Sequence, residues 1–153
     1  MAIEAPVSKF RKNNLKIYMV FALGLLAWCV YDGYFNEKWI EEHRNEDGSP
    51  KTYLTVNRRA PYLFVPLIGY FVISFFVIKN KKIVADENEL VISNNFKISY
   101  DSIQAIDKTL FEKKGKFSII YNDQDGREVS YKLSDRRYDN LSAVLEHITA
   151  KIS

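Results

Sequence analysis

The side chains that could carry out chemistry are few and scattered along the 153-residue chain. The histidines are His43 and His147, and the single cysteine, Cys29, lies in an apolar segment with no histidine beside it. A zinc site needs several His or Cys ligands at short spacings, and a nucleophilic cysteine needs a neighbouring base. The spacing therefore predicts no metal site, no cofactor and no enzyme activity.

Residues 122–126, Asn-Asp-Gln-Asp-Gly, are similar in sequence to the first positions of a calcium-binding loop. The loop also needs a bidentate Glu six residues after the Gly, and Lys132 occupies that position. An Asp-Gly pair between two alternating segments is a strong hairpin signal. We interpret Asp125 and Gly126 as a turn.

One cluster could recognise a ligand, and it consists of four lysines: Lys108, Lys113, Lys114 and Lys116. Each basic residue near an anionic leaflet contributes about 1 kcal/mol, so the cluster could attract lipid phosphates. Glu112 and Asp107 dilute this charge, and a solvated hairpin tip or a nonspecific surface attraction are the alternatives. Mixed charge suits a polar protein surface, so we expect a protein contact to be stronger here than a lipid contact. The net charge of +3 does not favour nucleic acid.

Charged residues avoid two windows, 17–31 and 60–78, although 27% of the chain is charged. Extended to residue 35, the first window matches the second in length, and about 20 apolar residues span a bilayer core. A soluble domain of the remaining size could hardly cover two helices that are apolar on every face. The sequence predicts a membrane hairpin over residues 17–78, with spans at 17–35 and 60–78.

Asp32 at the edge of the first span and Arg58 or Arg59 at the start of the second fall on the same side of this hairpin. They are interfacial charges, or they pair and set the register of the hairpin.

Basic residues flank the outer limits of the hairpin: Lys9, Arg11, Lys12, Lys16, Lys79, Lys81 and Lys82. The positive-inside rule then predicts a cytoplasmic N-terminal tail at 1–16 and a cytoplasmic C-terminus. The connector, 36–59, should lie outside. Within it we expect a short interfacial helix at 37–44, a turn at 46–50 and a short strand at 52–56.

From residue 82 onward apolar residues alternate with polar ones, as in half-buried antiparallel strands. The clearest alternation is Phe117, Ile119 and Tyr121, and turns are expected at 94–95, 114–115 and 125–126. Near the end, apolar residues recur at helical spacing: Tyr138, Leu141, Leu145, Ile148 and Ile152. That stripe predicts an amphipathic helix, capped by Ser134 or Asp135, that packs against the sheet or plugs its open end.

Three segments carry a resemblance to a known family: IVADENELVIS (83–93), FKISYDSIQAID (96–107) and LSDRRYDNLSAVLEHI (133–148). They are similar to the first hairpin, a central strand and the closing strand and helix of bacterial membrane-anchored pleckstrin-homology-like (PH-like) proteins. The resemblance covers 82–153. It implies a PH-like domain without shared catalytic residues, and the short chain leaves room for fewer than the usual seven strands.

The expected fold class is α+β: a two-helix transmembrane hairpin, then a small antiparallel PH-like domain with a C-terminal amphipathic helix. The expected location is a bacterial inner (cell) membrane, with several spans and both termini cytoplasmic. The expected function is an anchored interaction module that binds a membrane or cytoplasmic protein or stabilises a membrane complex. The alternatives are a small accessory subunit that binds through its hairpin, and an anionic-lipid sensor acting through 113–116.

Overall fold

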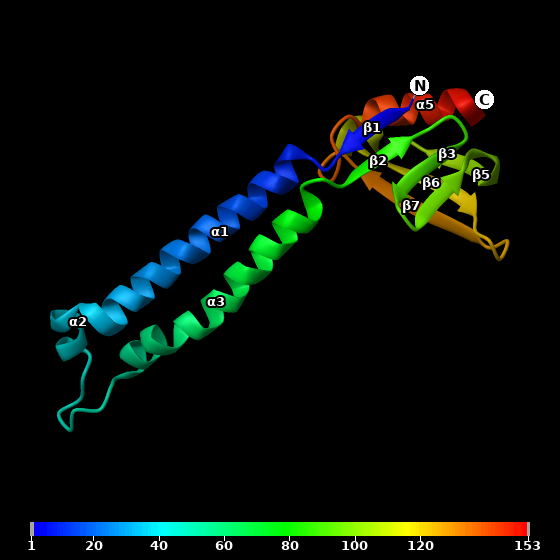
Figure 1. Ribbon diagram of the computed structural model, residues 1–153. Helices are drawn as coiled ribbons and strands as arrows, with labels where there is room; N and C mark the ends of the chain where they lie inside the picture. The colour runs from blue at the N-terminus through cyan, green and yellow to red at the C-terminus, as the bar shows by residue number, and fades with distance from the viewer. Residues whose placement is uncertain (1, 153) are drawn as a thin grey trace. The chain divides into compact units, whose positions relative to one another are not determined.

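The computed structural model describes residues 2–152 and contains two compact units (Figure 1). The hairpin unit is Asn14–Phe76. The other unit, which we call the β-domain, combines the residues before Asn14 with those after Phe76. The hairpin is therefore an insertion within the β-domain, and the N-terminal residues belong to the same unit as the C-terminal ones.

Two long helices form the hairpin. Helix α1 (Lys9–Val30) continues into a π-helical turn, η1 (Tyr31–Phe35), and helix α3 (Thr52–Ile78) returns. With η1 included, each helix has 27 residues, about 40 Å at 1.5 Å per residue, and is apolar enough to cross a ~30 Å bilayer core. This confirms two helices that could span a membrane.

The connector contains the short helix α2 (Glu37–Glu42), as expected, followed by a turn closed by a bridge between Arg44 and Pro50. The predicted strand at 52–56 is wrong, because these residues form the first turns of α3. A five-residue alternation is too short to separate a strand from a helix that buries one residue, here Leu54.

The β-domain contains two antiparallel sheets. The first has four strands in sequence order: β1 (Ile3–Pro6), β2 (Lys82–Ala85), β3 (Glu89–Ser93) and β4 (Phe96–Ser99). A 3-10 turn, η2 (Tyr100–Ser102), leads to the second sheet. Its three strands are β5 (Ile103–Asp107), β6 (Lys116–Asn122) and β7 (Glu128–Ser134).

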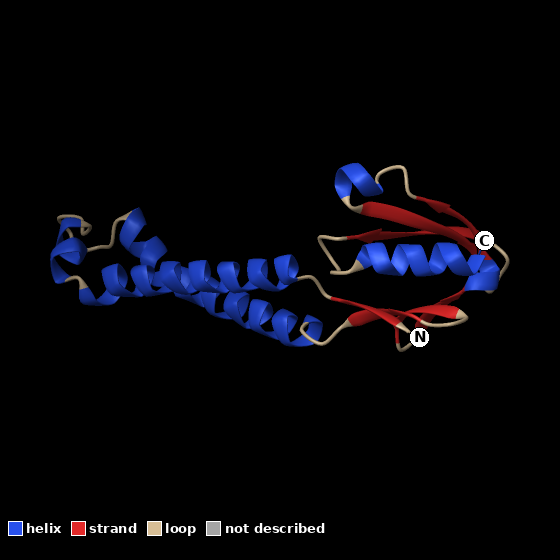
Figure 2. Ribbon diagram, turned by 90° about the horizontal axis from the view of Figure 1, so that it is seen from above, coloured by secondary structure: helices blue, strands red, loops and turns tan. Residues whose placement is uncertain are grey.

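The core lies between the two sheets and the C-terminal helix α5 (Leu141–Ile152), which covers the opening between them (Figure 2). Strand β6 buries Phe117, Ile119 and Tyr121, which confirms the predicted alternation. Helix α5 contributes Leu141, Val144, Leu145 and Ile148 to the same core. The predicted stripe is therefore correct for its central residues. Tyr138 precedes the helix and bridges to Val7 instead.

The N-terminal segment 1–16 was expected to be a tail, and the structure differs. Ile3–Pro6 pair with β2 along its full length, from Ile3 opposite Ala85 to Pro6 opposite Lys82. Ala5 and Val7 are buried in the β-domain. The local sequence could not reveal this, because a four-residue strand gives a weak signal and its partner lies beyond the whole hairpin. The domain expected at 82–153 therefore lacks one of its strands, and the described residues form seven strands rather than fewer.

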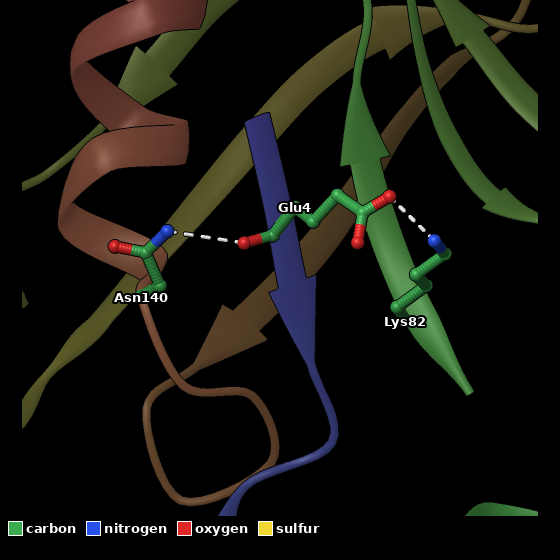
Figure 3. Close-up of polar contacts among 3 residues, drawn as sticks. All are labelled: Glu4, Lys82 and Asn140. Atoms are coloured by element: carbon green, nitrogen blue, oxygen red, sulfur yellow. Dashed lines mark hydrogen bonds and ion pairs between the residues drawn. The ribbon is translucent and has the colours of Figure 1, made fainter. Parts of the chain in front are cut away.

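Side chains reinforce the pairing of β1 with β2 (Figure 3). The Glu4 carboxylate forms an ion pair with the Lys82 ammonium group. On the other edge of β1, the Asn140 amide donates to the Glu4 carbonyl at 3.0 Å, and the Asp139 N–H donates to the Pro6 carbonyl at 2.9 Å. The outer carbonyls of Glu4 and Pro6 thus each have a donor while the other edge pairs with β2, which explains how four residues hold their place.

Ser8 caps the N-terminus of α1 and joins the helix to the β-domain. Its Oγ accepts a hydrogen bond from the Arg11 N–H at 3.1 Å and donates to the Arg136 carbonyl at 2.6 Å. The Ser8 N–H donates to the Arg137 carbonyl at 2.9 Å. Because Ser8 is fully buried, each of these groups needs its partner, and the start of the helix is fixed to the segment that follows β7.

These contacts predict which soluble fragments fold. We expect residues 2–13 joined by a flexible Gly/Ser linker to residues 77–152 to unfold cooperatively in urea. The 82–153 fragment should be several kcal/mol less stable or unfolded, because it loses the burial of Ala5 and Val7 and the backbone bonds of β1. Far-UV circular dichroism during a urea titration measures this.

The matched substitutions in the fusion are Ala5→Asp, which places an unpaired charge at a fully buried site, and Pro6→Ala at an exposed one. Only the first should lower the urea midpoint. Equal midpoints for the fusion and the 82–153 fragment would show that β1 contributes nothing to the domain.

Candidate functional site

The predicted basic turn is a single helical turn rather than a hairpin tip. Helix α4 (Phe111–Lys114) carries Lys113 and Lys114 in its last turn, and Gly115 ends it at a φ of 59°. A side chain at 115 would be strained at this φ and would collide with the Asp135 carboxylate, which lies over the glycine. The glycine therefore lets the α4 turn approach the end of β7.

Two of the four predicted lysines line a shallow depression of about 830 Å³. Lys113 and Lys114 lie there beside Phe111 of α4, Phe10 of α1 and Arg136, and the carboxylates of Glu112 and Asp135 line it as well. Lys108 follows β5 and Lys116 begins β6, and neither lines the depression. The structure therefore brings together only part of the predicted cluster and adds residues from two other segments.

Sequence reasoning missed Phe10 and Arg136 as partners of the lysines. Arg136 and Arg137 stand together after β7, and Phe10 stands among the basic residues before the first span, so the type of each residue was visible. What was missing is the link between these segments, which is made by the buried bonds of Ser8 to the Arg136 and Arg137 carbonyls. We call this part of the β-domain, residues 9–12, 79–81, 112–114 and 135–139, the basic end.

The basic end carries more positive than negative side chains. Its cations are Lys9, Arg11, Lys12, Lys79, Lys81, Lys113, Lys114, Arg136 and Arg137, and its anions are Glu112, Asp135 and Asp139. The Asp139 carboxylate is already occupied, because it accepts the Lys9 N–H at 3.0 Å at the start of α1. Farther along, hydrogen bonds from Thr109 lower the pKa of Asp107, which keeps that exposed carboxylate ionised beside Lys108.

A second depression of about 580 Å³ is a polar groove along β4. Its amide and hydroxyl side chains come from the turn before β4, from Ser99 and Ser102, and from the turn after β6: Asn94, Asn95, Asn122 and Gln124. These groups can donate and accept hydrogen bonds without a net charge. Phe96, Ile98 and Tyr121 give it an apolar floor, and Lys97 and Asp123 add one charge of each sign. The groove is suited to a partner segment without net charge that combines hydrogen-bonding groups with apolar contacts.

The groups with shifted pKa values do not converge on either depression. Burial, together with Asp86 and Glu89, raises the pKa of Tyr100 to about 12. The Tyr100 hydroxyl donates to the Asp86 carbonyl at 2.9 Å, and His147 Nε2 donates to the same carbonyl at 2.9 Å. This arrangement joins α5 to the turn before β3 and is structural. The described residues also contain no group of three His, Cys, Asp or Glu side chains placed to hold a metal ion.

The hairpin has its own polar cluster, centred on η1 at the end away from its termini. The buried Asp32 carboxylate accepts hydrogen bonds from the Trp28 indole and from the Asn36 amide at 2.9 Å. All three residues belong to one stretch of chain. The Asp32 carboxylate is therefore stabilised by donors close to it in the chain. It does not pair with Arg58 or Arg59, which was one of the two expected arrangements.

Arg58 joins the two helices through the backbone instead. Its Nε donates to the Gly33 carbonyl at 3.0 Å, and its guanidinium lies 5.8 Å from the centre of the Tyr34 ring. The Tyr34 hydroxyl donates in return to the Arg58 carbonyl at 3.1 Å. We call this group, Gly33, Tyr34 and Arg58, the clasp. It sets the register of the hairpin, which is the role that the sequence suggested for a pair between Asp32 and Arg58 or Arg59.

Comparison with known proteins finds no match: no family model, no curated protein and no solved structure matches this chain.

The clasp depends on a close approach of η1 to α3, and Gly33 permits it. A Cβ at 33 would lie 3.3 Å from the Asn57 carbonyl carbon, whereas one at Gly24 would meet nothing within 4 Å. We expect Gly33→Val to destabilise the folded hairpin by about 1–3 kcal/mol through overpacking, and the matched Gly24→Val to leave it unchanged. The readout is thermal unfolding of the full chain in detergent, followed by fluorescence of Trp28 and Trp39. Equal melting of the two variants would rule out a tight contact at Gly33.

Proposed function

We propose that this protein is a membrane-anchored PH-like interaction module, whose β-domain binds a protein partner or stabilises a membrane complex at the cytoplasmic face. The observation that carries the proposal is the insertion of two long apolar helices between β1 and β2. An insertion of this kind attaches the β-domain to its anchor at both helix ends. It therefore restricts the motion of the domain more than a single tether does.

Membrane anchoring is supported by how little of the two helices is covered. Only 11% and 6% of the residues in their most apolar windows are buried. Side chains meet between the helices at a few places, such as Tyr18 and Phe71, whose ring centres are 5.8 Å apart. Exposed apolar surface on this scale is costly in water and is the normal state of a helix in lipid.

The PH-like assignment is supported by the order and number of the elements. Four strands form one sheet and three the other, and α5 closes the opening between them. The three segments that carry the resemblance fall on β2–β3, on β4–β5 and on β7–α5. Packing features of this kind specify a fold and leave the binding function to the surface.

The pairing of β1 with β2 also bears on topology. Strands that share a sheet must lie on the same side of a bilayer, so both flanks of the hairpin lie together. The basic residues on those flanks then favour the cytoplasmic side of a bacterial inner membrane, with two spans.

Single-cysteine labelling in a Cys29→Ser background tests this topology. Glu46→Cys, in the connector, should react with an impermeant maleimide in intact cells. Ala2→Cys and Ala150→Cys should react only after the membrane is opened, because they lie on the two flanks of the hairpin. Labelling of the two flank positions on opposite sides would contradict the β1–β2 pairing in the membrane-bound protein, and labelling of Glu46→Cys only after lysis would reverse the orientation.

The partner should bind the β-domain, and the polar groove is the surface that we propose. The second candidate is binding through the hairpin, which is favoured by the open space around Gly24 and Gly69 on the two helices. The two candidates differ in which part of the chain the partner binds, the β-domain or the hairpin. Replacing Asn14–Phe76 by an unrelated two-span hairpin keeps β1 and separates them.

Proteins crosslinked to the unmodified chain in native membranes should also crosslink to this chimera. They should be lost from a variant with Asn95→Arg and Gln124→Arg, two substitutions that fill the groove with charge. Ser142→Arg, at an exposed position of α5, is the control and should leave crosslinking intact. Partners that disappear from the chimera but survive the groove substitutions would assign the function to the hairpin.

A further inference from the structure

We infer that the basic end of the β-domain is a docking surface for anionic phospholipids, where Lys113, Lys114 and Arg136 contact headgroup phosphates and Phe10 and Leu110 enter the interfacial layer. The inference rests on the membrane anchoring in the proposed function and goes beyond it. It names the bilayer leaflet itself as the ligand of this surface.

The first argument is position. Phe10 belongs to the first turn of α1, the helix that leaves the β-domain for the hairpin, and it shares the depression with Lys113, Lys114 and Arg136. Where the chain returns from α3, the Lys81 carbonyl accepts the Val7 N–H at 2.9 Å, directly before Ser8. The exit and the return of the chain are therefore adjacent, and the basic residues surround them. In an anchored protein this is the end of the domain that faces the leaflet.

The second argument is charge that is free to bind. Within residues 2–152, Glu4 pairs with Lys82 and Glu89 with Lys97, whereas Lys113, Lys114 and Arg136 take part in no ion pair. All three side chains are exposed. Attraction to an anionic leaflet fades within a Debye length of about 8 Å at physiological salt, so only cations held near the bilayer contribute. The connectivity of the chain holds these cations there.

The third argument is the apolar side chains beside the cations. Phe10 is 55% exposed, and Leu110, immediately before α4, is 45% exposed. Peripheral proteins combine basic residues with exposed aromatic or aliphatic ones in this way, since the first attract headgroups and the second bury in the acyl boundary.

Charge along the sequence alone favoured a protein contact for the α4 turn, because Glu112 and Asp107 dilute the lysines. In the structure Phe10 and Arg136 join the turn and Asp107 does not line the depression, but Glu112 stays and Asp135 is added, so three cations lie beside two carboxylates. What favours lipid is the exposed apolar side chain of Phe10 together with the cations on the two flanks of the hairpin: Lys9, Arg11, Lys12 and Lys81. An acidic protein that docks on the same surface is the competing explanation, and the test below separates it from lipid.

The test uses the full chain, with Cys29→Ser and a single Leu110→Cys that carries an environment-sensitive fluorophore. The protein is reconstituted in vesicles of phosphatidylcholine alone, or with three parts in ten of phosphatidylglycerol. We expect a blue-shifted emission and quenching by a nitroxide lipid only in the anionic vesicles, and the quenching should weaken as NaCl is raised. No other protein is present, so a lipid-dependent signal identifies lipid as the ligand.

The Lys113→Gln, Lys114→Gln variant should lower the docking equilibrium constant by up to about 30-fold at low salt, because each lysine near an anionic leaflet contributes about 1 kcal/mol. The matched control is Arg127→Gln, Lys151→Gln, which removes the same charge. Arg127 follows the turn at the opposite end of the β6–β7 hairpin from Lys116, and Lys151 lies in the last turn of α5. This control should dock as well as the unmodified chain.

Equal quenching in the two vesicle types, or no response of the unmodified chain to salt, would overturn the inference. The salt titration needs no substitution, so it stands even if a variant folds poorly. An equal loss of docking in the two charge variants would also overturn it, because the attraction would then depend on the net charge of the protein and not on this surface. Protection of the label in native membranes without any response in anionic vesicles would assign the surface to a protein. Resistance of the chain to carbonate extraction reports on anchoring separately, so failure of docking is distinguishable from failure of the proposed function.

Discussion

The antiparallel pairing of β1 with β2 is the constraint on which the rest of this structure depends. It joins residues on the two sides of the hairpin in one sheet, through the register from Ile3–Ala85 to Pro6–Lys82. Closing so long a loop costs conformational entropy, but the cost rises only slowly with loop length. Burial of Ala5 and Val7 and the bonds of Asn140 and Asp139 to β1 offset it.

The hairpin unit depends on contacts at its turn. Around the turn, the clasp fixes Arg58 to the backbone of η1, and η1 also turns the buried Asp32 toward its local donors. A single π-helical turn shifts the helix register, which is a common way to direct a side chain that an α-helix would point elsewhere. Along their length the helices leave most apolar side chains exposed, which suits contact with lipid or with other helices.

Within the β-domain, binding capacity is divided between two surfaces of different chemistry. The basic end combines cations with the exposed side chains of Phe10 and Leu110, and the groove along β4 offers amides and hydroxyls beside apolar side chains. A leaflet selects for charge and apolar depth, whereas a polar protein segment selects for directed hydrogen bonds. A domain that docks on lipid through one surface can present the other to a partner in a fixed orientation, which links the further inference to the proposed function.

The sequence by itself determined the features that depend on local periodicity. These are the two apolar helices, the alternation of β6, the apolar stripe of α5 and the Asp125–Gly126 turn, because each is encoded by residues within a few positions of one another. Only the tertiary structure decided that Ile3–Pro6 complete the sheet, that Arg58 rather than Asp32 joins the helices, and that Phe10 and Arg136 share a surface with Lys113 and Lys114. Each of these features is a contact between segments that are distant in the chain. A short strand or a lone arginine carries no local pattern that names its partner, so the contact is set by packing of the whole fold.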